Sequence, residues 1–472
     1  MTATHVDVAI IGAGTAGLSA RQEVARHTNE YVVIDPGPLG TTCARVGCMP
    51  SKALIHMANV YHQLVNAPRG LNVRPVAAPD LAAVMGHVRE LRDFYVAGVL
   101  KEMEEWRNAH LIQRWARFVD PHTLDLDGDR LTADRIIVAT GSKPVVPESW
   151  RRFGERVVDT DRFFELQALP SRFAVIGLGP VGIELAQAMQ QLGVEITAVT
   201  GNRGVGGLTD PEIQTYVFDH FSQTMDIWLD TADIEEGEEN RIRVRAGGRT
   251  RQVDCVLAAM GRRPAVADLG LENLGVPLDD DGLPAFDPVT LKVKDLPIFL
   301  AGDMNGISPV LHEATDEGRI AGYNACQRDP VCFVRRTPLA ITFTSPSIAL
   351  VGSTYRALEE EGRDFVCGKV SFEQQGRARL MNAACGLLKV YVEPQEGKIL
   401  GAEMFAPAGE HLAHLLAWSI AMEMTLADLL KMPYYHPVLE EGLRTALRDA
   451  ARELKIPISY NEIMRCKDNP VP

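Results

Sequence analysis

The stretch V-D-V-A-I-I-G-A-G-T-A-G, residues 6–17, decides the fold of this chain. A short apolar run of strand length leads into three glycines, and a helical stretch follows from Leu18 to about His27. Gly12 permits a tight turn, Gly14 lets the backbone approach a pyrophosphate, and Gly17 allows close packing of the helix on the strand. Because the helix N-terminus then faces the phosphates, the segment predicts a strand–turn–helix unit that binds a dinucleotide.

The same design recurs later in the chain. Residues 173–182 read F-A-V-I-G-L-G-P-V-G, with Gly177, Gly179 and Gly182 at the corresponding places. A helix is expected to follow through about Gln191, and then a strand over residues 195–199. Two units of this kind predict two bound dinucleotides, an arrangement that suits a flavin–nicotinamide electron relay.

The residues that end the second strand of each unit differ in charge. Asp35 lies 18 residues after Gly17, where a carboxylate can accept both ribose hydroxyls of an adenosine. The residue 18 positions after Gly182 is Thr200, which is uncharged, and Arg203 follows in the same loop. An Arg here can pair with a 2′-phosphate or can be a solvated loop residue, so NAD(H) and NADP(H) both stay open.

Two cysteines follow the first unit in T-T-C-A-R-V-G-C-M-P-S-K, residues 41–52. Cys43 and Cys48 could be two unrelated buried thiols, because free cysteine packs as a small hydrophobe. A zinc half-site is a second possibility, but no matching ligand pair occurs elsewhere, and no metal site is predicted. The third possibility is a redox pair, since the helix expected over residues 51–55 would lower the pKa of a nearby thiol.

Further segments occur in an order that carries a family resemblance. Together with the glycine units and the cysteines, the chain resembles the FAD-dependent pyridine nucleotide–disulfide oxidoreductases, and within them it is most like dihydrolipoyl dehydrogenase. The further segments that match are V-A-T-G (138–141), A-M-G-R-R-P (259–264), I-F-L-A-G-D (298–303), L-H-E-A (311–314), G-R-A (376–378) and H-P-V-L-E-E (436–441).

The resemblance implies an α/β fold with three kinds of domain. Two are Rossmann-like dinucleotide-binding domains, and the third is a C-terminal α+β interface or dimerisation domain. The FAD-binding domain is expected over residues 1–147 and 270–335, the NAD(P)-binding domain over 148–269, and the interface domain over 336–472. Residues 233–251 are expected to form a surface hairpin inside the NAD(P) domain.

The resemblance also implies catalytic roles. Cys48 is expected to lie against the flavin, and Cys43 to face the substrate and perform thiol–disulfide interchange. His436 is expected to be the acid/base, with Glu441 orienting it; Glu440 is the competing carboxylate. The dyad is expected to reach the cysteines from the other subunit, which implies a homodimer with shared active sites.

The cofactor-binding residues are implied in the same way. Lys52 is expected beside the flavin, paired with Glu184. The residues expected to bind FAD are Gly12, Gly14, Gly17, Asp35, Lys52, Thr140, Gly141 and Asp303. Those expected at NAD(P) or near the flavin are Gly177, Gly179, Gly182, Glu184, Thr200, Arg203 and Gly261.

The substrate is less constrained than the chemistry. A dihydrolipoyl-type dithiol, free or carried on a protein, is the main expectation, with another disulfide of the glutathione type or a quinone as alternatives. Mercuric reductase is disfavoured because the tail holds a lone cysteine, Cys466. Several residues depart from the dihydrolipoyl pattern: Thr41, Arg45, and two tyrosines, Tyr434 and Tyr435, which are expected to narrow or reshape the thiol channel.

Composition sets the remaining expectations. The chain has 472 residues, so more than one domain is expected. Its net charge of −14 argues against nucleic acid as a main partner. The N-terminus lacks the pattern of a secretory signal, and the apolar runs are too short to span a bilayer. A cytoplasmic protein that does not enter the membrane is therefore predicted.

Overall fold

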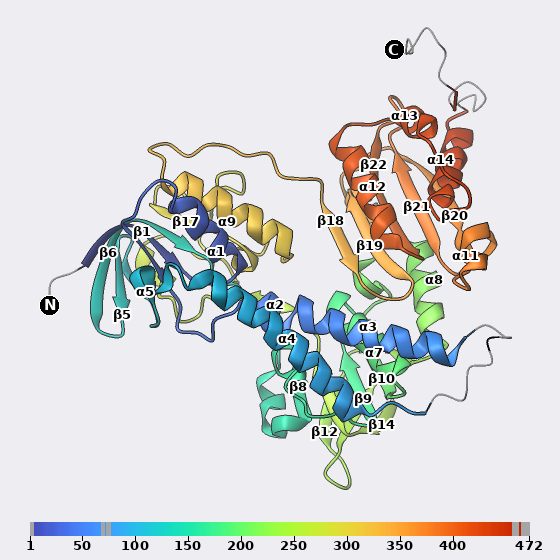
Figure 1. The fold of residues 1–472 in the computed structure, drawn as a ribbon, viewed down its shortest axis with the longest axis horizontal. Coiled ribbons are helices and arrows are strands. Elements are labelled where there is room, and N and C mark those ends of the chain that lie inside the picture. Colours follow the sequence, from blue (N-terminus) through green and yellow to red (C-terminus); the bar gives the residue numbers. More distant parts are fainter. Residues whose placement is uncertain (1–3, 68–70, 72–76, 456–461, 464–472) are drawn as a thin grey trace.

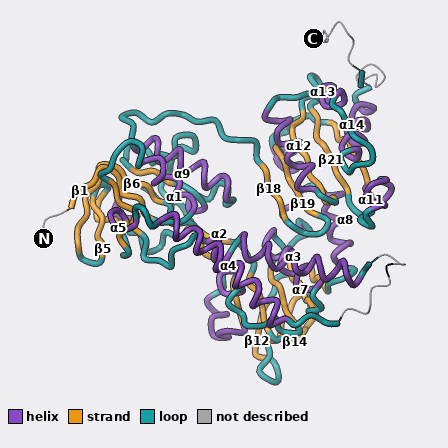
Figure 2. Tube along the Cα trace, viewed as in Figure 1, coloured by secondary structure: helices purple, strands orange, loops and turns teal. Residues whose placement is uncertain are grey.

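The computed structural model describes residues 4–67, 71, 77–455 and 462–463. The chain forms three layered units, one at the N-terminal strands, one around β9 and one at the C-terminal sheet (Figure 1). Each unit combines helices with strands (Figure 2). In the part of the chain that the structure describes, no helix is both long and apolar enough to cross a membrane.

The first sheet holds the N-terminal glycine turn. Its strand order is β3-β2-β1-β6-β5-β4, and β17 pairs with the C-terminal end of β6. The central pairs β1–β2, β1–β6 and β17–β6 are parallel, so their carboxyl ends meet at one edge. The strands are β1 (Thr4–Ile11), β2 (Tyr31–Ile34), β3 (Leu111–Ile112), β4 (Arg117–Asp120), β5 (Thr123–Leu126), β6 (Asp129–Val138) and β17 (Ile298–Leu300).

Two helices of this unit approach each other closely because one of them has glycine at the contact. Helix α1 (Thr15–Val24) packs against α9 (Leu311–Ala325). A Cβ on Gly318 would lie 2.2 Å from the Ala16 carbonyl oxygen, and one on Gly322 would lie 2.6 Å from the Ala20 oxygen. The close approach needs glycine at both places and brings the N-terminal ends of α1 and α9 to one cavity.

Two long helices, α3 and α4, pack side by side between the first and second sheets (Figure 1). The helices from this part of the chain are α2 (Thr42–Val46), α3 (Cys48–Val65), α4 (Leu81–Met103) and α5 (Arg107–His110). The sequence predicted the helix after the cysteines from residue 51, but α3 begins at Cys48, and Cys43 lies in the short α2.

The second sheet holds the second glycine turn. Its order is β11-β10-β9-β15-β8, with every pair parallel. The helix predicted through Gln191 and the strand predicted over 195–199 are both present as α7 and β10. The elements are β8 (Val157–Asp159), α6 (Thr160–Phe163), β9 (Arg172–Ile176), α7 (Pro180–Gln191), β10 (Glu195–Thr200), α8 (Pro211–Ser222), β11 (Asp226–Leu229) and β15 (Cys255–Ala258).

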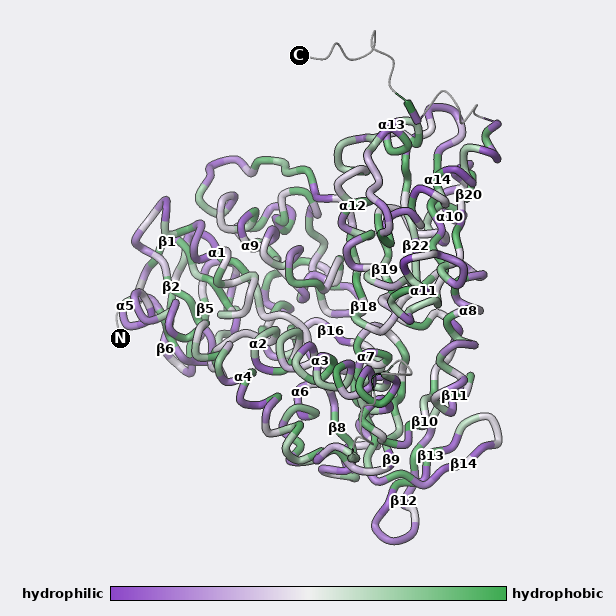
Figure 3. The backbone as a smooth tube through the Cα atoms, turned by 45° about the vertical axis from the view of Figure 1, so that its right-hand side comes forward, coloured by the Kyte–Doolittle hydropathy of each residue, from purple (hydrophilic) through white to green (hydrophobic). Residues whose placement is uncertain are grey.

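The hairpin predicted over residues 233–251 is present as a three-stranded antiparallel sheet. Its strands are β12 (Asp233–Glu236), β13 (Ile242–Ala246) and β14 (Arg249–Val253), and the turn after β12 is hydrophilic (Figure 3). A two-stranded ladder of β7 (Ser142–Pro144) and β16 (Arg262–Pro264) pairs the two chain segments that enter and leave the second unit.

The C-terminal unit is an antiparallel sheet with helices packed on it. The order is β18-β19-β22-β21-β20, and β21 and β22 are buried along their whole length. An extended loop between α9 and β18 connects this unit to the first one (Figure 1). The elements are β18 (Leu339–Thr342), β19 (Ser347–Gly352), α10 (Tyr355–Glu360), β20 (Val366–Ser371), α11 (Gly376–Leu380), β21 (Leu387–Val392), β22 (Ile399–Ala406), α12 (Gly409–Ala421), α13 (Leu426–Lys431) and α14 (Glu441–Glu453).

The predicted fold class is confirmed: two Rossmann-like α/β units accompany a C-terminal α+β unit. Short 3₁₀ turns complete the architecture: η1 (Glu148–Arg156), η2 (Val205–Gly207), η3 (Leu271–Leu274), η4 (Asp303–Asn305) and η5 (Phe372–Gln374). The second and third units share a buried ion pair, with Lys389 Nζ 2.7 Å from an Asp210 carboxylate oxygen. The pair joins the N-terminus of α8 to β21 in the interior, where either charge alone would be costly to bury.

Candidate active site

The first glycine turn is built backbone against backbone. Gly12 has φ +107°, and a Cβ there would lie 2.3 Å from the Ala139 carbonyl oxygen. A Cβ on Gly17 would lie 1.9 Å from the Gly12 oxygen, so helix α1 can pack on the strand only through glycine. Gly14, the residue before α1, has open space where a Cβ would be. The turn therefore presents bare backbone and a helix N-terminus to a ligand.

The second turn repeats these contacts almost unchanged. Gly177 has φ +97°, and its Cβ would lie 2.3 Å from the Ala259 oxygen. A Cβ on Gly182 would lie 1.9 Å from the Gly177 oxygen, and Gly179, before α7, again faces open space. Both predicted dinucleotide turns thus have the same physical construction.

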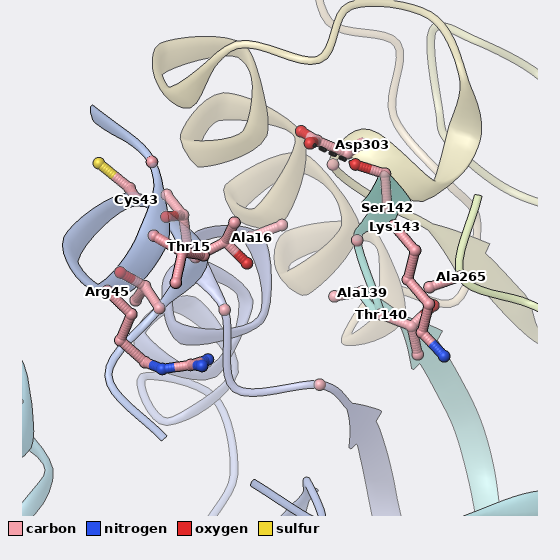
Figure 4. Close-up of a pocket in the computed structure, with 18 of the residues that line it drawn as sticks. Thr15, Ala16, Cys43, Arg45, Ala139, Thr140, Ser142, Lys143, Ala265 and Asp303 are labelled. Carbon is pink, nitrogen blue, oxygen red and sulfur yellow. Dashed lines mark hydrogen bonds between the residues drawn. The ribbon is translucent and has the colours of Figure 1, made fainter. Parts of the chain in front are cut away.

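A cavity of about 480 Å³ lies at the carboxyl edge of the first sheet (Figure 4). Its wall includes the first glycine turn, both cysteines of the pair, and the N-terminal end of α9. Of the residues expected to bind FAD, those that line it are Gly12, Gly14, Asp35, Lys52, Thr140, Gly141 and Asp303. Gly17 does not line the cavity; it packs against the Gly12 carbonyl and so supports the turn.

Some polar groups on this wall are hydrogen-bonded to each other, and one buried hydroxyl is not. Asp303 accepts a hydrogen bond from the Ser142 hydroxyl at 2.9 Å, and the Arg262 Nε donates to the same Ser142 oxygen at 2.8 Å. The Thr140 hydroxyl is buried and has no hydrogen-bond partner among the residues that the structure describes. A buried hydroxyl without a partner is costly, so Thr140 is suited to bonding a ligand.

Asp35 is positioned by the turn that it serves. One carboxylate oxygen accepts the Ala13 N–H at 2.6 Å, and the other accepts the Gly37 N–H at 2.7 Å. These bonds hold the side chain at the end of β2, on the cavity wall. The glycine turn, the acid at the strand end and the unpartnered Thr140 hydroxyl fit an adenine dinucleotide such as FAD.

Cys43 and Cys48 both line the cavity as free thiols, and their side chains are hydrogen-bonded to each other. Cys43 is half-buried on α2, and Cys48 is exposed to the cavity at the first position of α3. A hydrogen bond from a thiol to a neighbouring thiolate is the arrangement expected of a reduced redox pair. The two cysteines that the sequence predicted as a redox pair are therefore brought together.

The two thiols have very different acidities. The hydrogen bond from Cys43 lowers the pKa of Cys48 to about 7, and Lys52 and the Cys48 backbone N–H act in the same direction against the effect of burial. The same hydrogen bond, with burial, raises the pKa of Cys43. Cys48 is therefore the sulfur that ionises first as the pH rises, and Cys43 keeps its proton.

The ion pair predicted between Lys52 and Glu184 is present. The Lys52 Nζ lies 2.8 Å from Glu184 Oε2 and 4.7 Å from the centre of the Phe343 ring. The second Glu184 oxygen accepts the Phe343 N–H at 2.7 Å, and the Glu184 side chain is only 5% exposed. The pair joins α3 to α7 at the cavity wall, so a cation is held one helical turn from Cys48.

The predicted His436–Glu441 dyad is also formed. His436 Nδ1 lies 3.1 Å from each Glu441 carboxylate oxygen, and the Val438 N–H donates to the same carboxylate at 3.2 Å. The hydrogen bond from His436 lowers the pKa of Glu441. Glu440 occupies the N-cap position of α14 without a side-chain capping bond, and Glu441 is the carboxylate that contacts His436.

The dyad does not meet the cysteines within one chain. The His436 side chain is 81% exposed, and His436 is not among the residues that line the cavity. The dyad lies at the N-terminal end of α14 in the C-terminal unit, whereas the cysteines lie at α2 and α3 between the first two units (Figure 1).

The two tyrosines beside His436 have different environments. The Tyr434 hydroxyl donates to the Leu429 carbonyl at 3.3 Å, and burial raises the pKa of Tyr434 to about 12. Tyr435 is 81% exposed. Tyr434 therefore packs inside the C-terminal unit, and only Tyr435 is free to contact a substrate.

The remaining predicted residues surround the second turn. The Thr200 hydroxyl donates to the Asn202 carbonyl at 3.2 Å and ends β10. The Arg203 guanidinium lies over the Phe218 ring at 4.6 Å and 3.9 Å from Asp219, on the surface. Gly261 has φ +96° and open space around it, next to Arg262 on the cavity wall.

Sequence reasoning did not select two residues of the network on the cavity wall, Ser142 and Arg262. Ser142 directly follows the V-A-T-G segment, and Arg262 belongs to the G-R-R-P segment, so both were adjacent to motifs that had been recognised. Their pairing across β7 and β16 required the tertiary structure. Cys466, the lone tail cysteine, lies outside the described residues.

Two dinucleotide turns, together with an acidic thiol beside a second thiol and a lysine paired with a buried carboxylate, define a two-dinucleotide disulfide oxidoreductase. Residues 6–318 match the pyridine nucleotide-disulphide oxidoreductase family, and residues 339–447 match its dimerisation domain. The chain belongs to this family, whose enzymes act on sulfur groups with FAD and NAD(P).

The chain is similar to dihydrolipoyl dehydrogenases along nearly its whole length. It is 31% identical to that of Thermus scotoductus, covering 93% of this chain and 96% of the relative. It is 29% identical to that of Haloferax volcanii, covering 95% and 97%.

Two solved structures share the fold. One is the flavoprotein disulfide reductase RclA from Escherichia coli, with a TM-score of 0.81 at 23% identity, covering 95% of this chain and 99% of that one. The other is LpdA from Mycobacterium tuberculosis, with a TM-score of 0.81 at 24% identity, covering 94% and 99%.

Proposed function

We propose that this protein is a dihydrolipoyl dehydrogenase-like enzyme that moves electrons between a dihydrolipoyl-type dithiol and NAD(P)⁺ through Cys43 and Cys48. The observation that carries the proposal is that Cys43 and Cys48 meet on the wall of the cavity at the first glycine turn, where their hydrogen bond lowers the pKa of Cys48 to about 7. Thiol–disulfide exchange is faster when the leaving thiol has a low pKa, and Cys48 is the sulfur released when a substrate thiolate attacks Cys43.

The base in this proposal is His436. An ionised carboxylate can only accept hydrogen bonds, so we assign the imidazole proton to Nδ1, which faces both Glu441 oxygens. Nε2 is then left with its lone pair, and it can take the proton of a substrate thiol. Because the dyad is exposed and away from the cysteines of its own chain, the proposal places it against the cysteine pair of a second copy.

In this proposal electrons leave the substrate in two thiol–disulfide exchange steps. One substrate thiol loses its proton to His436 Nε2, and the resulting thiolate attacks Cys43 Sγ, which breaks the Cys43–Cys48 disulfide and releases Cys48 as thiolate. His436 passes that proton to the Cys43 sulfur and takes the proton of the second substrate thiol, whose sulfur displaces Cys43 from the mixed disulfide. The substrate departs as a disulfide, Cys43 is left as a thiol and Cys48 as a thiolate, and His436 keeps the second proton.

Bound FAD, with NAD(P)⁺ behind it, supplies the electron acceptor that restores the disulfide. The residues proposed to hold FAD are the first glycine turn with Asp35, Thr140, Gly141 and Asp303, and Lys52 would face it as a paired cation. The second glycine turn is proposed to hold the nicotinamide dinucleotide, with Thr200 and Arg203 near its adenosine ribose. The domain limits and the cytoplasmic location predicted from the sequence stay predictions.

A substrate panel tests the reaction. Turnover is measured with dihydrolipoamide, a lipoyl protein, glutathione disulfide and a quinone, each with both nicotinamides. We expect dithiol turnover with NAD⁺ or NADP⁺, and its loss in Cys43→Ser and Cys48→Ser, while Cys332→Ser keeps it because Cys332 is an exposed free cysteine outside the cavity. Full turnover in Cys48→Ser would refute the assignment.

One observation favours a second candidate, the NAD(P)H-dependent reduction of another disulfide. The exposed ring of Tyr435 stands directly beside the base, so a bulkier or flatter disulfide than a lipoyl group could use it as a wall. In the same panel, this candidate predicts faster turnover of glutathione disulfide than of dihydrolipoamide, and a change of that ratio in Tyr435→Ala.

The shared site has its own test. Equal amounts of Cys43→Ala and His436→Gln dimers are dissociated, mixed and reassociated. If each site combines the cysteines of one chain with the dyad of the other, half the dimers are mixed and each has one intact site, so about a quarter of wild-type activity returns. If each chain holds a complete site, no activity returns, because every chain carries one defect.

A further inference from the structure

Arg45, the residue between the two cysteines that departs from the family pattern, lines the cofactor cavity. Its Nη1 donates one hydrogen bond, to the Pro38 carbonyl at 3.2 Å, in the loop after Asp35. The aliphatic stem passes beside Gly40, where an added Cβ would lie 3.4 Å from the Arg45 Cδ. The side chain is therefore held along the wall between helix α2 and the end of β2.

The Arg45 guanidinium points away from the exchanging sulfur. Cys43 and Arg45 are two positions apart on α2, and residues at that spacing do not share a helix face. Figure 4 shows the Cys43 sulfur and the Arg45 guanidinium directed to opposite sides, with Arg45 below Thr15 of the first glycine turn. Arg45, which departs from the family pattern, is therefore directed toward the first glycine turn and not toward the Cys43 sulfur.

Arg45 has no ion-pair partner in the described part of the chain. Other cations on the cavity wall have carboxylate partners: Lys52 with Glu184 at 2.8 Å, Arg114 with Asp129 at 2.5 Å, and Arg262 with Asp161 at 3.4 Å. Among the residues that the structure describes, no carboxylate lies within ion-pair distance of Arg45, and only one of its five N–H donors is used.

Lys143 is the other cation of the wall without a carboxylate partner among the described residues, but it lies elsewhere. Figure 4 shows it beside Thr140 and Ala265, across the cavity from the glycine turn. A dinucleotide places its pyrophosphate at the N-terminus of the helix that follows the glycine turn. Of these two side chains, which have no carboxylate partner among the described residues, Arg45 is the one near the glycine turn and the start of α1.

We infer that Arg45 is a pyrophosphate-binding residue for FAD, adding charge-assisted hydrogen bonds to the backbone amides at the start of α1. A guanidinium can present two parallel N–H groups to phosphate oxygens, which a neutral side chain at this position cannot do. The inference uses only the requirement of the family for FAD and is independent of which dithiol or disulfide the enzyme turns over.

The test measures flavin affinity and not turnover. Holoprotein is diluted, and released FAD is followed by its fluorescence in the wild type, Arg45→Asn, Arg45→Lys and Arg26→Asn. Arg26 is a matched control, since it is an exposed Arg paired with Glu23 and does not line the cavity. We expect Arg45→Asn to weaken FAD binding about ten- to a hundred-fold, with Arg45→Lys between it and the wild type.

Two competitors isolate the phosphate contact. ADP carries the pyrophosphate without the isoalloxazine ring, and adenosine lacks both phosphates. In full-length protein stripped of flavin, Arg45→Asn should weaken ADP by the same factor as FAD and leave adenosine unchanged. An unchanged FAD affinity in Arg45→Asn, an equal loss in Arg26→Asn, or an equal loss for adenosine would each overturn the inference. Thermal unfolding of each variant identifies any loss that comes from misfolding.

Discussion

The acidity of Cys48 depends first on its hydrogen bond with Cys43, and this can be measured. With a pKa of about 7, about half of the Cys48 side chains are thiolate at neutral pH in the reduced protein. An ordinary cysteine has a pKa of about 8.5, so only a few per cent of it would be ionised there. The difference of about one and a half units corresponds to roughly 2 kcal/mol in favour of the thiolate.

The perturbation is Cys43→Ala, which removes the donor but leaves Lys52 and the start of α3 in place. Because the hydrogen bond from Cys43 is the largest cause of the lowered pKa, its loss should raise the midpoint by about one unit. Cys43→Ser retains an O–H donor at the same place and should restore most of the lowering. Lys52→Met should raise the pKa of Cys48 less than Cys43→Ala does, because its charge is a smaller cause.

The assay is a pH titration of thiolate ultraviolet absorbance in reduced, flavin-free protein, where FAD does not obscure the signal. The Cys48→Ser variant supplies the background to subtract, so that the six other described cysteines do not contribute to the difference. A Cys48 midpoint unchanged in Cys43→Ala, or one moved further by Lys52→Met than by Cys43→Ala, would refute the reasoning.

Two further predictions concern stability. Thr41 has φ 59° and ψ 148°, a strained conformation for a β-branched residue, and glycine caps a helix nearly as well as threonine. Thr41→Gly should therefore stabilise the protein by about 1 kcal/mol in denaturant unfolding. Thr42→Gly, which lies inside α2, should destabilise it. Glu462 bonds Arg448 at 2.5 Å and Arg444 at 2.6 Å, and these guanidinium groups lower its pKa to about 2. Its stabilising contribution should be complete above about pH 4.3 and lost as the pH falls toward 2, so the stability difference between wild type and Glu462→Gln should shrink over that range; a difference independent of pH would contradict it.

The dinucleotide turns were predictable because their requirements are local. Each glycine is needed for a contact within a few residues or with one neighbouring strand, and the apolar runs before the turns have the length of buried strands. Helix starts were less predictable: α3 begins at Cys48 and not at residue 51, since Gly47 can end one short helix and begin the next. Pro50 argues against a helix over Cys48-Met49-Pro50, but the first turn of a helix tolerates proline.

The catalytic pairs were predictable from spacing and resemblance, but their surroundings were not. Lys52 and Glu184 are 132 positions apart, and only their places in two motifs connected them. Nothing local distinguishes Tyr434 from Tyr435, because which ring is buried depends on how the segment before α14 packs on α13. The direction of Arg45 likewise depends on Pro38 and Gly40, which the loop after Asp35 brings to α2.

The near-identical construction of the two glycine turns has a consequence for how coenzyme preference can evolve. Both turns are held by contacts of backbone with backbone, so neither can change without breaking the fold. If the second turn holds the nicotinamide dinucleotide as proposed, we expect selection for one nicotinamide over the other to act at Thr200 and the exposed residues 201–203. Exchanging that short surface segment should retune the enzyme to a different reductant pool while the redox centre stays untouched.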